Sequence, residues 1–272
     1  MPRAIVQELH VYPLKSTRGI PRASVRLTAT GFEWDRHWMV VRADGLFLSQ
    51  RTHPRLARIA TALSAEGLAL DSAGLQKLVL PLEPRGERRR VKVWNDVCEG
   101  LDQGDAAAHW VSAVLEEPAR LVRVPPGPRR FANPEYAGTQ AAPLAFPDGY
   151  PVLVCNRASL DDLNRRLPEA LPMERFRPNL VIEGLAPFAE DHIHTLGIGP
   201  VTLRLVKPCT RCIIPSTDQR TGARGLDPLP VLRTYRFDRT LRGVTFGENA
   251  VIVSGAGETL ECGAECRVIE ED

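Results

Sequence analysis

The sequence predicts a mainly β protein with a few helices, an α+β fold class. Residues 4–100 contain short apolar runs separated by turn dipeptides, a pattern typical of small β-barrels and sandwiches. Helical periodicity is clear over residues 104–115, and short apolar runs return in the second half of the chain. The proline-rich residues 125–130 break regular structure. We therefore place a boundary there and predict two domains, 1–124 and 125–272.

The first domain is expected to consist of strands joined by tight turns. Strands are predicted near residues 4–11 and at 24–28, 78–80 and 91–94. Two hairpins are predicted where a turn dipeptide joins two apolar runs, namely 37–41 with 46–48 across Asp44-Gly45, and 60–63 with 68–70 across Glu66-Gly67.

The remaining elements mix helices and strands. A helix is predicted over residues 104–115, and a second helix is expected to be capped by Ser159. Strands are predicted at 121–124, 151–155, 180–182, 201–206, 250–253 and 266–269.

Two cysteines follow the strand predicted at 201–206. Because Pro208 cannot donate to a strand ladder, we expect the strand to end there and Cys209 and Cys212 to lie on a loop. A thiol on such a loop, beside cations, tends to be reactive and able to bind a soft metal. The spacing alone equally fits half of a zinc site, a redox disulfide or two ordinary cysteines. A zinc site would need a second pair of ligands, for which the sequence offers Cys262 with Cys266 or His192 with His194.

Composition excludes several classes of function. The net charge of +2 gives no argument for a nucleic-acid or membrane partner. No apolar run approaches the roughly 20 residues of a membrane span, and the first residues lack a signal-peptide core, so we expect a cytoplasmic protein. Six irregularly spaced cysteines do not form a disulfide framework. The phosphate-binding motifs GxxxxGK[ST] and GxGxxG and the nucleophile motif GxSxG are absent from the sequence.

Other polar clusters fall in predicted turns or at strand ends. Lys15 and Ser16 lie in a turn that could hold a phosphate through the amine, the hydroxyl and backbone N–H groups. Arg36 precedes a predicted strand, and Arg177 stands next to a proline. Each cluster alone is more often part of a solvated surface.

Taken in order, these clusters resemble the MOSC superfamily. The motifs are Tyr12-Pro13-x-Lys15-Ser16, Asp35-Arg36-x-Trp38, Arg51-x-x-Pro54-Arg55-Leu56, Phe176-Arg177-Pro178-Asn179, Glu190-Asp191 and Cys209-Thr210-Arg211-Cys212. The similarity is to the branch that includes the mitochondrial amidoxime reducing component and its bacterial relatives. It implies an N-terminal β-barrel domain packed on a β-barrel MOSC domain.

The resemblance also implies a molybdenum cofactor with its pterin. Cys212 matches the cysteine that ligates molybdenum in the family. The matching cofactor-binding positions are Lys15, Ser16, Arg36, Asp148, Arg177, Asn179, Thr210 and Arg211. In the sequence Asp148-Gly149-Tyr150-Pro151, the pair Gly149-Tyr150 replaces polar residues of the family pattern. Asp218 and the Glu190-Asp191 pair are expected near the substrate or in proton transfer.

The implied activity is a molybdenum-dependent oxidoreductase that reduces N-hydroxylated or N-oxide compounds such as hydroxylamines and amidoximes. Because the sequence lacks a closely spaced iron–sulfur cysteine run, electrons are expected from a separate ferredoxin- or flavoprotein-type reductase. Two alternatives remain. One is a cofactor-binding or sulfur-carrier module without reductase activity, and the other is a zinc or thiol-redox protein that uses Cys209 and Cys212 together.

Overall fold

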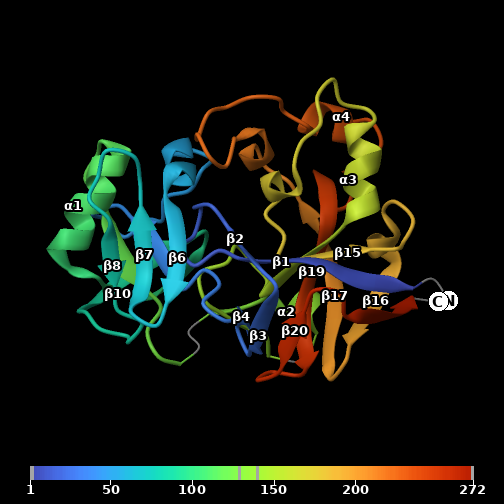
Figure 1. Cartoon of the computed structure of the whole chain (residues 1–272), viewed down its shortest axis with the longest axis horizontal. Helices are drawn as coiled ribbons and strands as arrows, with labels where there is room; N and C mark the ends of the chain where they lie inside the picture. Colours follow the sequence, from blue (N-terminus) through green and yellow to red (C-terminus); the bar gives the residue numbers. More distant parts are fainter. Residues whose placement is uncertain (1–2, 128–129, 139–140, 271–272) are drawn as a thin grey trace.

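A computed structural model describes residues 3–127, 130–138 and 141–270 of the chain. It confirms the mainly β fold class, because strands account for 41% of the residues and helices for 17%. Figure 1 shows two β-rich parts side by side, one around β6–β8 and the other around β15–β19. They comprise a half-barrel and a closed barrel of seven strands.

The closed barrel is built mainly from the second half of the chain. Its strands, in order around the barrel, are β14 (Val152–Asn156), β15 (Leu180–Glu183), β1 (Ala4–Val11), β21 (Glu265–Glu270), β16 (Ile193–Ile198), β17 (Val201–Thr210) and β19 (Gly243–Ser254). Pairing of β14 with β19 closes the ring, so none of these strands keeps a fully unpaired edge. Valine, leucine and isoleucine side chains from alternate positions fill its interior.

The first strand of the chain belongs to this barrel. β1 pairs with β15 on one side and with β21 on the other, and both partners lie beyond residue 179. Four short strands lie outside the ring: β2 (Ile20–Arg22) pairs with β1, and β3 (Ser24–Thr28) pairs with both β4 (Gly31–Phe32) and β20 (Thr259–Glu261) in a sheet of their own. The domain boundary at residue 124 thus stays a prediction. Strand pairing shows in addition that the N-terminal strand β1 lies in the closed barrel, whose other strands come from the second half of the chain.

The second part contains two sheets that enclose a separate apolar core. One sheet has the order β5 (Trp38–Val41), β11 (Arg120–Arg123), β10 (Asp96–Asp102) and β9 (Arg88–Val93). The other contains β6 (Ala60–Ser64), β7 (Gly67–Asp71) and β8 (Leu78–Leu80). Helix α1 (Gly104–Leu115) and the 3-10 helix η1 (Pro54–Arg58) contact each other beside these sheets and bury their apolar side chains in the same core.

The other helices are short and lie outside the barrel. Figure 1 shows α3 (Arg157–Asn164) and α4 (Leu229–Arg233) together above the barrel strands. They share a third apolar cluster with Phe176 and Phe246. The remaining short elements are α2 (Pro134–Ala137), η2 (Met173–Arg175), η3 (Ala189–His192), η4 (Ile214–Ser216), β12 (Arg130–Phe131), β13 (Pro143–Leu144) and β18 (Phe237–Asp238).

Most local predictions are confirmed. β6 and β7 form the predicted hairpin, and an antiparallel bridge from Val41 to Phe47 forms the other. The helix at 104–115 has the predicted bounds. The predicted cap at Ser159 is wrong: Asn156 caps α3 by accepting from the backbone N–H of Ala158, which leaves Ser159 buried inside the helix.

The predicted end of the strand at Pro208 is also wrong. β17 continues through Pro208 to Thr210 and stays paired with β19. The pairing register shifts between Leu205 and Lys207 and again between Pro208 and Thr210. Such irregular positions tolerate a residue without an N–H, so the strand continues past the proline. Cys209 is therefore a strand residue, and Cys212 follows two residues after the strand.

Candidate functional site

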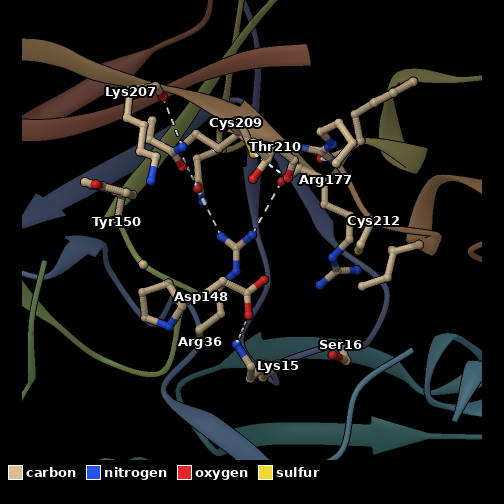
Figure 2. A pocket seen from close by; sticks show the side chains of 18 of the residues that line it. Lys15, Ser16, Arg36, Asp148, Tyr150, Arg177, Lys207, Cys209, Thr210 and Cys212 are labelled. Carbon is tan, nitrogen blue, oxygen red and sulfur yellow. Dashed lines mark hydrogen bonds and ion pairs between the residues drawn. The ribbon is translucent and has the colours of Figure 1, made fainter. Parts of the chain in front are cut away.

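A pocket of about 280 Å³ opens where the end of β17 meets the turn after β1. We call it the cysteine pocket. Its lining residues come from seven separate stretches of the sequence: Lys15, Ser16, Arg36, Arg51, Pro147, Asp148, Gly149, Tyr150, Leu153, Phe176, Arg177, Asn179, Lys207, Pro208, Cys209, Thr210, Arg211, Cys212, Ile214 and Asn249. Figure 2 shows the labelled members of this set. Every predicted cofactor-binding residue therefore lies in one pocket.

The cysteine pocket carries an excess of positive charge. Its lining contains the cationic residues Lys15, Arg36, Arg51, Arg177, Lys207 and Arg211, but Asp148 is the one carboxylate among the lining residues that the structure describes. Partly buried cations repel one another unless an anion compensates them. The composition of the lining thus fits an anionic ligand.

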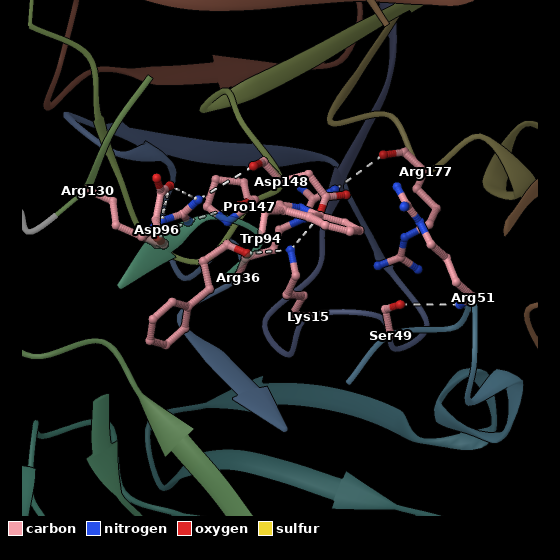
Figure 3. A network of polar contacts seen from close by, with 12 residues as sticks. Lys15, Arg36, Ser49, Arg51, Trp94, Asp96, Arg130, Pro147, Asp148 and Arg177 are labelled. Atoms are coloured by element: carbon pink, nitrogen blue, oxygen red, sulfur yellow. Dashed lines mark hydrogen bonds and ion pairs between the residues drawn. The ribbon is translucent and has the colours of Figure 1, made fainter. Parts of the chain in front are cut away.

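Lys15 and Asp148 form one wall of the pocket. The Lys15 amine donates to an Asp148 carboxylate oxygen at 2.6 Å and to the Phe146 carbonyl at 2.8 Å, and Trp94 donates to the same carboxylate at 3.0 Å (Figure 3). Burial lowers the pKa of Lys15 to about 8, and Asp148 limits that fall. The Lys15 amine, helped by the Trp94 N–H, holds the pKa of the Asp148 carboxyl well below its usual value, although that side chain is itself exposed. This pair leaves Lys15 mostly charged at neutral pH.

Two further side chains support this wall from behind. The guanidinium of Arg130, which is buried, donates to the carbonyls of Ala145 and Pro147 at 3.1 and 3.0 Å and pairs with Asp96 at 2.9 Å. Arg51 stacks over the Trp94 ring at 4.1 Å. The segment before Asp148 is thereby fixed against the β-rich part that contains β9 and β10.

Two arginines enclose the ring of Tyr12. The guanidinium carbons of Arg36 and Arg177 lie 4.3 and 4.4 Å from the ring centre, and the Tyr12 hydroxyl donates to the Pro178 carbonyl at 3.0 Å. Arg36 donates to the side-chain oxygen of Asn179 at 3.0 Å, and Arg177 donates to the Thr17 carbonyl at 2.5 Å. Burial lowers the pKa of Arg177 to about 10, which still leaves it charged at neutral pH.

Three residues of the pocket have left-handed backbone conformations. The φ angles are 67° for Ser16, 52° for Arg36 and 59° for Arg177. A residue with a Cβ rarely adopts this region, and clusters of such residues are typical of functional sites. Among the described residues, no hydrogen bond to the Ser16 hydroxyl is present, so this group is available to a ligand.

Both cysteines line the pocket as free thiols. The Arg211 guanidinium donates to the Cys209 sulfur at 3.0 Å and to the Phe176 carbonyl at 2.5 Å. Burial raises the pKa of Cys209, although Arg211 opposes this shift. Arg211 thus donates a hydrogen bond to the sulfur of Cys209, so the two thiols lie in different environments.

Comparison with known protein families identifies both parts of the chain. A "MOSC N-terminal beta barrel domain" matches residues 3–118, and a "MOSC domain" matches residues 141–271. Mitochondrial amidoxime-reducing component 1 of Mus musculus is 34% identical over 85% of this chain and 71% of its own length. The human protein of the same name is 35% identical over 85% of this chain and 72% of its own length. This chain belongs to their family.

Component 2 of Bos taurus matches this MOSC protein similarly, with 33% identity over 85% of the chain and 72% of its own length. The resemblance to the MOSC family drawn from the ordered motifs is thereby confirmed. In the described ranges of this MOSC protein, the helices are all too short or too polar to cross a membrane.

Asp218 does not line the cysteine pocket of this MOSC protein. It lies in a neighbouring groove, where its carboxylate accepts from the backbone N–H groups of Thr221 and Arg220 at 2.8 and 3.0 Å and pairs with Arg175 at 3.3 Å. These backbone hydrogen bonds, that of Thr221 first, lower its pKa. Its contacts are those of a turn-stabilising residue, so our proposal gives it no part in the chemistry.

The Glu190-Asp191 pair also lies away from the pocket lining. Glu190 is buried and accepts from the Ser159 hydroxyl at 2.8 Å, whereas Asp191 pairs with Arg236 at 2.6 Å. No cluster of three or more His, Cys, Asp or Glu side chains suited to a metal ion is found in the described part of the chain. The structure therefore does not place the alternative zinc ligands beside Cys209 and Cys212.

Four polar residues of the pocket were not among the predicted site residues, namely Arg51, Tyr150, Lys207 and Asn249. Arg51 stood in one of the quoted motifs, and Lys207 was conspicuous because the chain has only four lysines. Asn249 donates to the Lys207 carbonyl at 3.1 Å from the next strand. No local pattern marks Asn249, because its position depends on the register between β17 and β19.

Proposed function

We propose that this MOSC protein binds a molybdenum cofactor in the cysteine pocket and reduces N-hydroxylated compounds such as amidoximes and hydroxylamines. The observation that carries the proposal is the combination of two free thiols with six cationic side chains in one pocket. A soft thiolate suits molybdenum, and clustered cations suit the phosphate of the pterin. The names of the relatives, amidoxime-reducing components, support the same activity.

The pocket residues divide into two groups in this proposal. Cys212 ligates the metal, and the Lys15 and Ser16 turn, together with Arg36, Arg177, Asn179 and Asp148, holds the pterin and its phosphate. Thr210 and Arg211 position the strand end that carries the thiols. The two partners of Arg211, Cys209 and the Phe176 carbonyl, keep its guanidinium in place.

When bound, the cofactor supplies the two-electron chemistry that removes the oxygen of an N–OH group. Two electrons and two protons then convert N–OH into N–H and water. The electrons come from a separate ferredoxin- or flavoprotein-type donor. A reducing compartment such as the cytoplasm would keep both pocket thiols free.

The test is metal content beside activity. Wild type, Cys212→Ala and Cys209→Ala are produced in a host that makes the cofactor, and molybdenum and released pterin are measured. We expect near-stoichiometric molybdenum in the wild type, loss or altered ligation in Cys212→Ala, and retention in Cys209→Ala. Reduction of benzamidoxime by the wild type with a chemical electron donor completes the test.

Each alternative has its own outcome. Zinc that requires both cysteines, or a Cys209–Cys212 disulfide without metal, would contradict the proposal. Molybdenum without reduction of any N-hydroxylated compound would favour a cofactor-binding or sulfur-carrier module.

A further inference from the structure

One edge of the cysteine pocket differs from the rest, and the proposal above assigns none of its residues to the metal or to the pterin. It is formed by Tyr150, Lys207 and Asn249, with Tyr136 of α2 behind Lys207. In Figure 2, Tyr150 and Lys207 lie at the same end of the pocket, away from Lys15 and Ser16. We call Tyr136, Tyr150 and Lys207 the lysine edge.

Lys207 has a positive charge without a carboxylate partner. Its amine lies 4.1 Å from the centre of the Tyr136 ring, and no ion pair to it is found in the described part of the chain. A lysine or arginine side chain is usually either paired with a carboxylate or fully solvated. A cation held over an aromatic face, at the mouth of a pocket, keeps its charge available to an anion.

Tyr150 adds an unused hydrogen-bond donor. Its hydroxyl oxygen is buried, and no partner for it exists among the described residues. Burial, with smaller contributions from Tyr136 and Glu135, raises the pKa of Tyr150 to about 12, so the hydroxyl keeps its proton at neutral pH. An unpaired buried hydroxyl costs free energy unless a ligand or water satisfies it.

The lysine edge lies close along strand β17 to the end that carries the proposed metal ligand. Lys207 and Thr210 are three positions apart on the same strand, a distance of about 10 Å or less at a bulged strand end. A substrate whose N–OH group reaches the thiols could therefore place a second group, one aromatic ring away, against Lys207.

We infer that the lysine edge is a substrate subsite that selects N-hydroxylated compounds carrying a carboxylate, bound by Lys207 and by the Tyr150 hydroxyl. This inference rests on the proposed function and specifies its substrate class. The carboxylate would satisfy both the unpaired charge of Lys207 and the unpaired donor of Tyr150. The remaining cations of the pocket would stay with the cofactor.

The experiment compares two substrates that differ only in the anionic group, benzamidoxime and 4-carboxybenzamidoxime. Protein loaded with cofactor is assayed as wild type, Lys207→Met, Tyr150→Phe and Lys207→Arg. We expect wild type to prefer the carboxylate compound. Lys207→Met should raise its KM by about tenfold to a hundredfold, because a charge-assisted hydrogen bond is lost. The KM for benzamidoxime should stay within about twofold, and Lys207→Arg should restore part of the preference.

A matched control removes one positive charge elsewhere. Lys77 is exposed and lies outside the pocket, so Lys77→Met should leave both KM values unchanged. Binding of the product 4-amidinobenzoate, measured by calorimetry on the loaded protein, gives a readout that does not depend on turnover. It should weaken in Lys207→Met and in Tyr150→Phe, whereas binding of benzamidine should not.

The outcomes separate the two ideas. Wild type that reduces benzamidoxime but shows no preference for the carboxylate compound overturns the subsite alone. So does an equal loss of both substrates in Lys207→Met, or a loss of bound molybdenum, since Lys207 would then hold the cofactor. Wild type that carries no molybdenum, or reduces neither compound, overturns the proposed function and the subsite with it.

Discussion

Glu248 is the buried acid next to the cysteine pocket that the proposed chemistry does not use. It lies on β19 opposite Pro208, is 3% exposed, and one of its carboxylate oxygens has no partner among the described residues. Burial raises its pKa to about 9, and the nearby Asp191, Glu190 and Asp238 add to the shift while Arg236 opposes it. The side chain is therefore mostly protonated at neutral pH.

This raised pKa makes a prediction about stability. The unfolded chain loses the Glu248 proton near pH 4.5, whereas the folded chain keeps it until about pH 9. The folded state thus binds more protons between these values, and its stability falls as pH rises through that window, by up to about 1.4 kcal/mol per pH unit. Glu248→Gln should remove this loss. We expect the variant to be more stable than wild type at pH 8 and no more stable at pH 4.

Urea unfolding at both pH values tests the prediction, with Glu261→Gln on the exposed side of β20 as the control. The control should behave as wild type at both pH values. Equal stability of Glu248→Gln and wild type at pH 8 would show that Glu248 is ionised without cost. In that case a partner for its free oxygen would have to exist.

At the scale of elements, the barrel closes where β14 and β19 meet, and this contact requires a glycine. Gly247 has a φ of 74°. A Cβ at this position would lie 2.6 Å from the Cys155 sulfur and 2.7 Å from the Val154 carbonyl oxygen. The close approach brings Glu248 and Asn249 into register with the end of β17, and hence places Asn249 in the cysteine pocket.

Gly247→Ala should therefore cost more than backbone strain alone. Gly263 also has a positive φ, 86°, but a Cβ there would meet no atom within 4 Å. Gly263→Ala then measures the cost of the left-handed backbone, roughly 1 kcal/mol. Gly247→Ala adds the clash with two buried atoms, so we expect a further loss of about 1–3 kcal/mol. Urea midpoints of the two variants give the difference, and equal midpoints would mean that β14 and β19 can separate without cost.

The local sequence predicts those secondary-structure elements that are determined within a few residues. Hairpins and α1 follow from turn dipeptides and periodicity, which act over a few residues, and both are confirmed. The continuation of β17 past Pro208 could not be predicted, because it depends on a bulged register with β19, more than thirty residues later in the chain. The ordered motifs contain eleven of the twenty residues that line the cysteine pocket. No local pattern marks Trp94, which supports Asp148 through a hydrogen bond.

At the scale of the whole molecule, a pair of buried amides joins the two β-rich parts behind the cysteine pocket. Gln50 donates to the side-chain oxygen of Gln219 at 2.9 Å, and Gln219 donates back to that of Gln50 at 3.0 Å. Both side chains are almost fully buried. Gln50 also donates to the Ser16 carbonyl, and Arg177 donates to Gln219, so the pair contacts two residues of the pocket.

Methionine variants of this amide pair test how strongly the two parts are coupled. Gln50→Met or Gln219→Met alone leaves the other amide buried without its partner, a loss of about 1–3 kcal/mol each. The double variant removes both polar groups, so its loss should be smaller than the sum, and the difference is the coupling energy. Because Arg177 and Ser16 depend on this pair, we also expect the single variants to bind inorganic phosphate in the pocket more weakly than wild type. Additive losses in urea unfolding would mean that water replaces each missing amide, and the two β-rich parts would then be joined through other contacts, such as those of Arg224 with the carbonyls of Gln50 and Arg51.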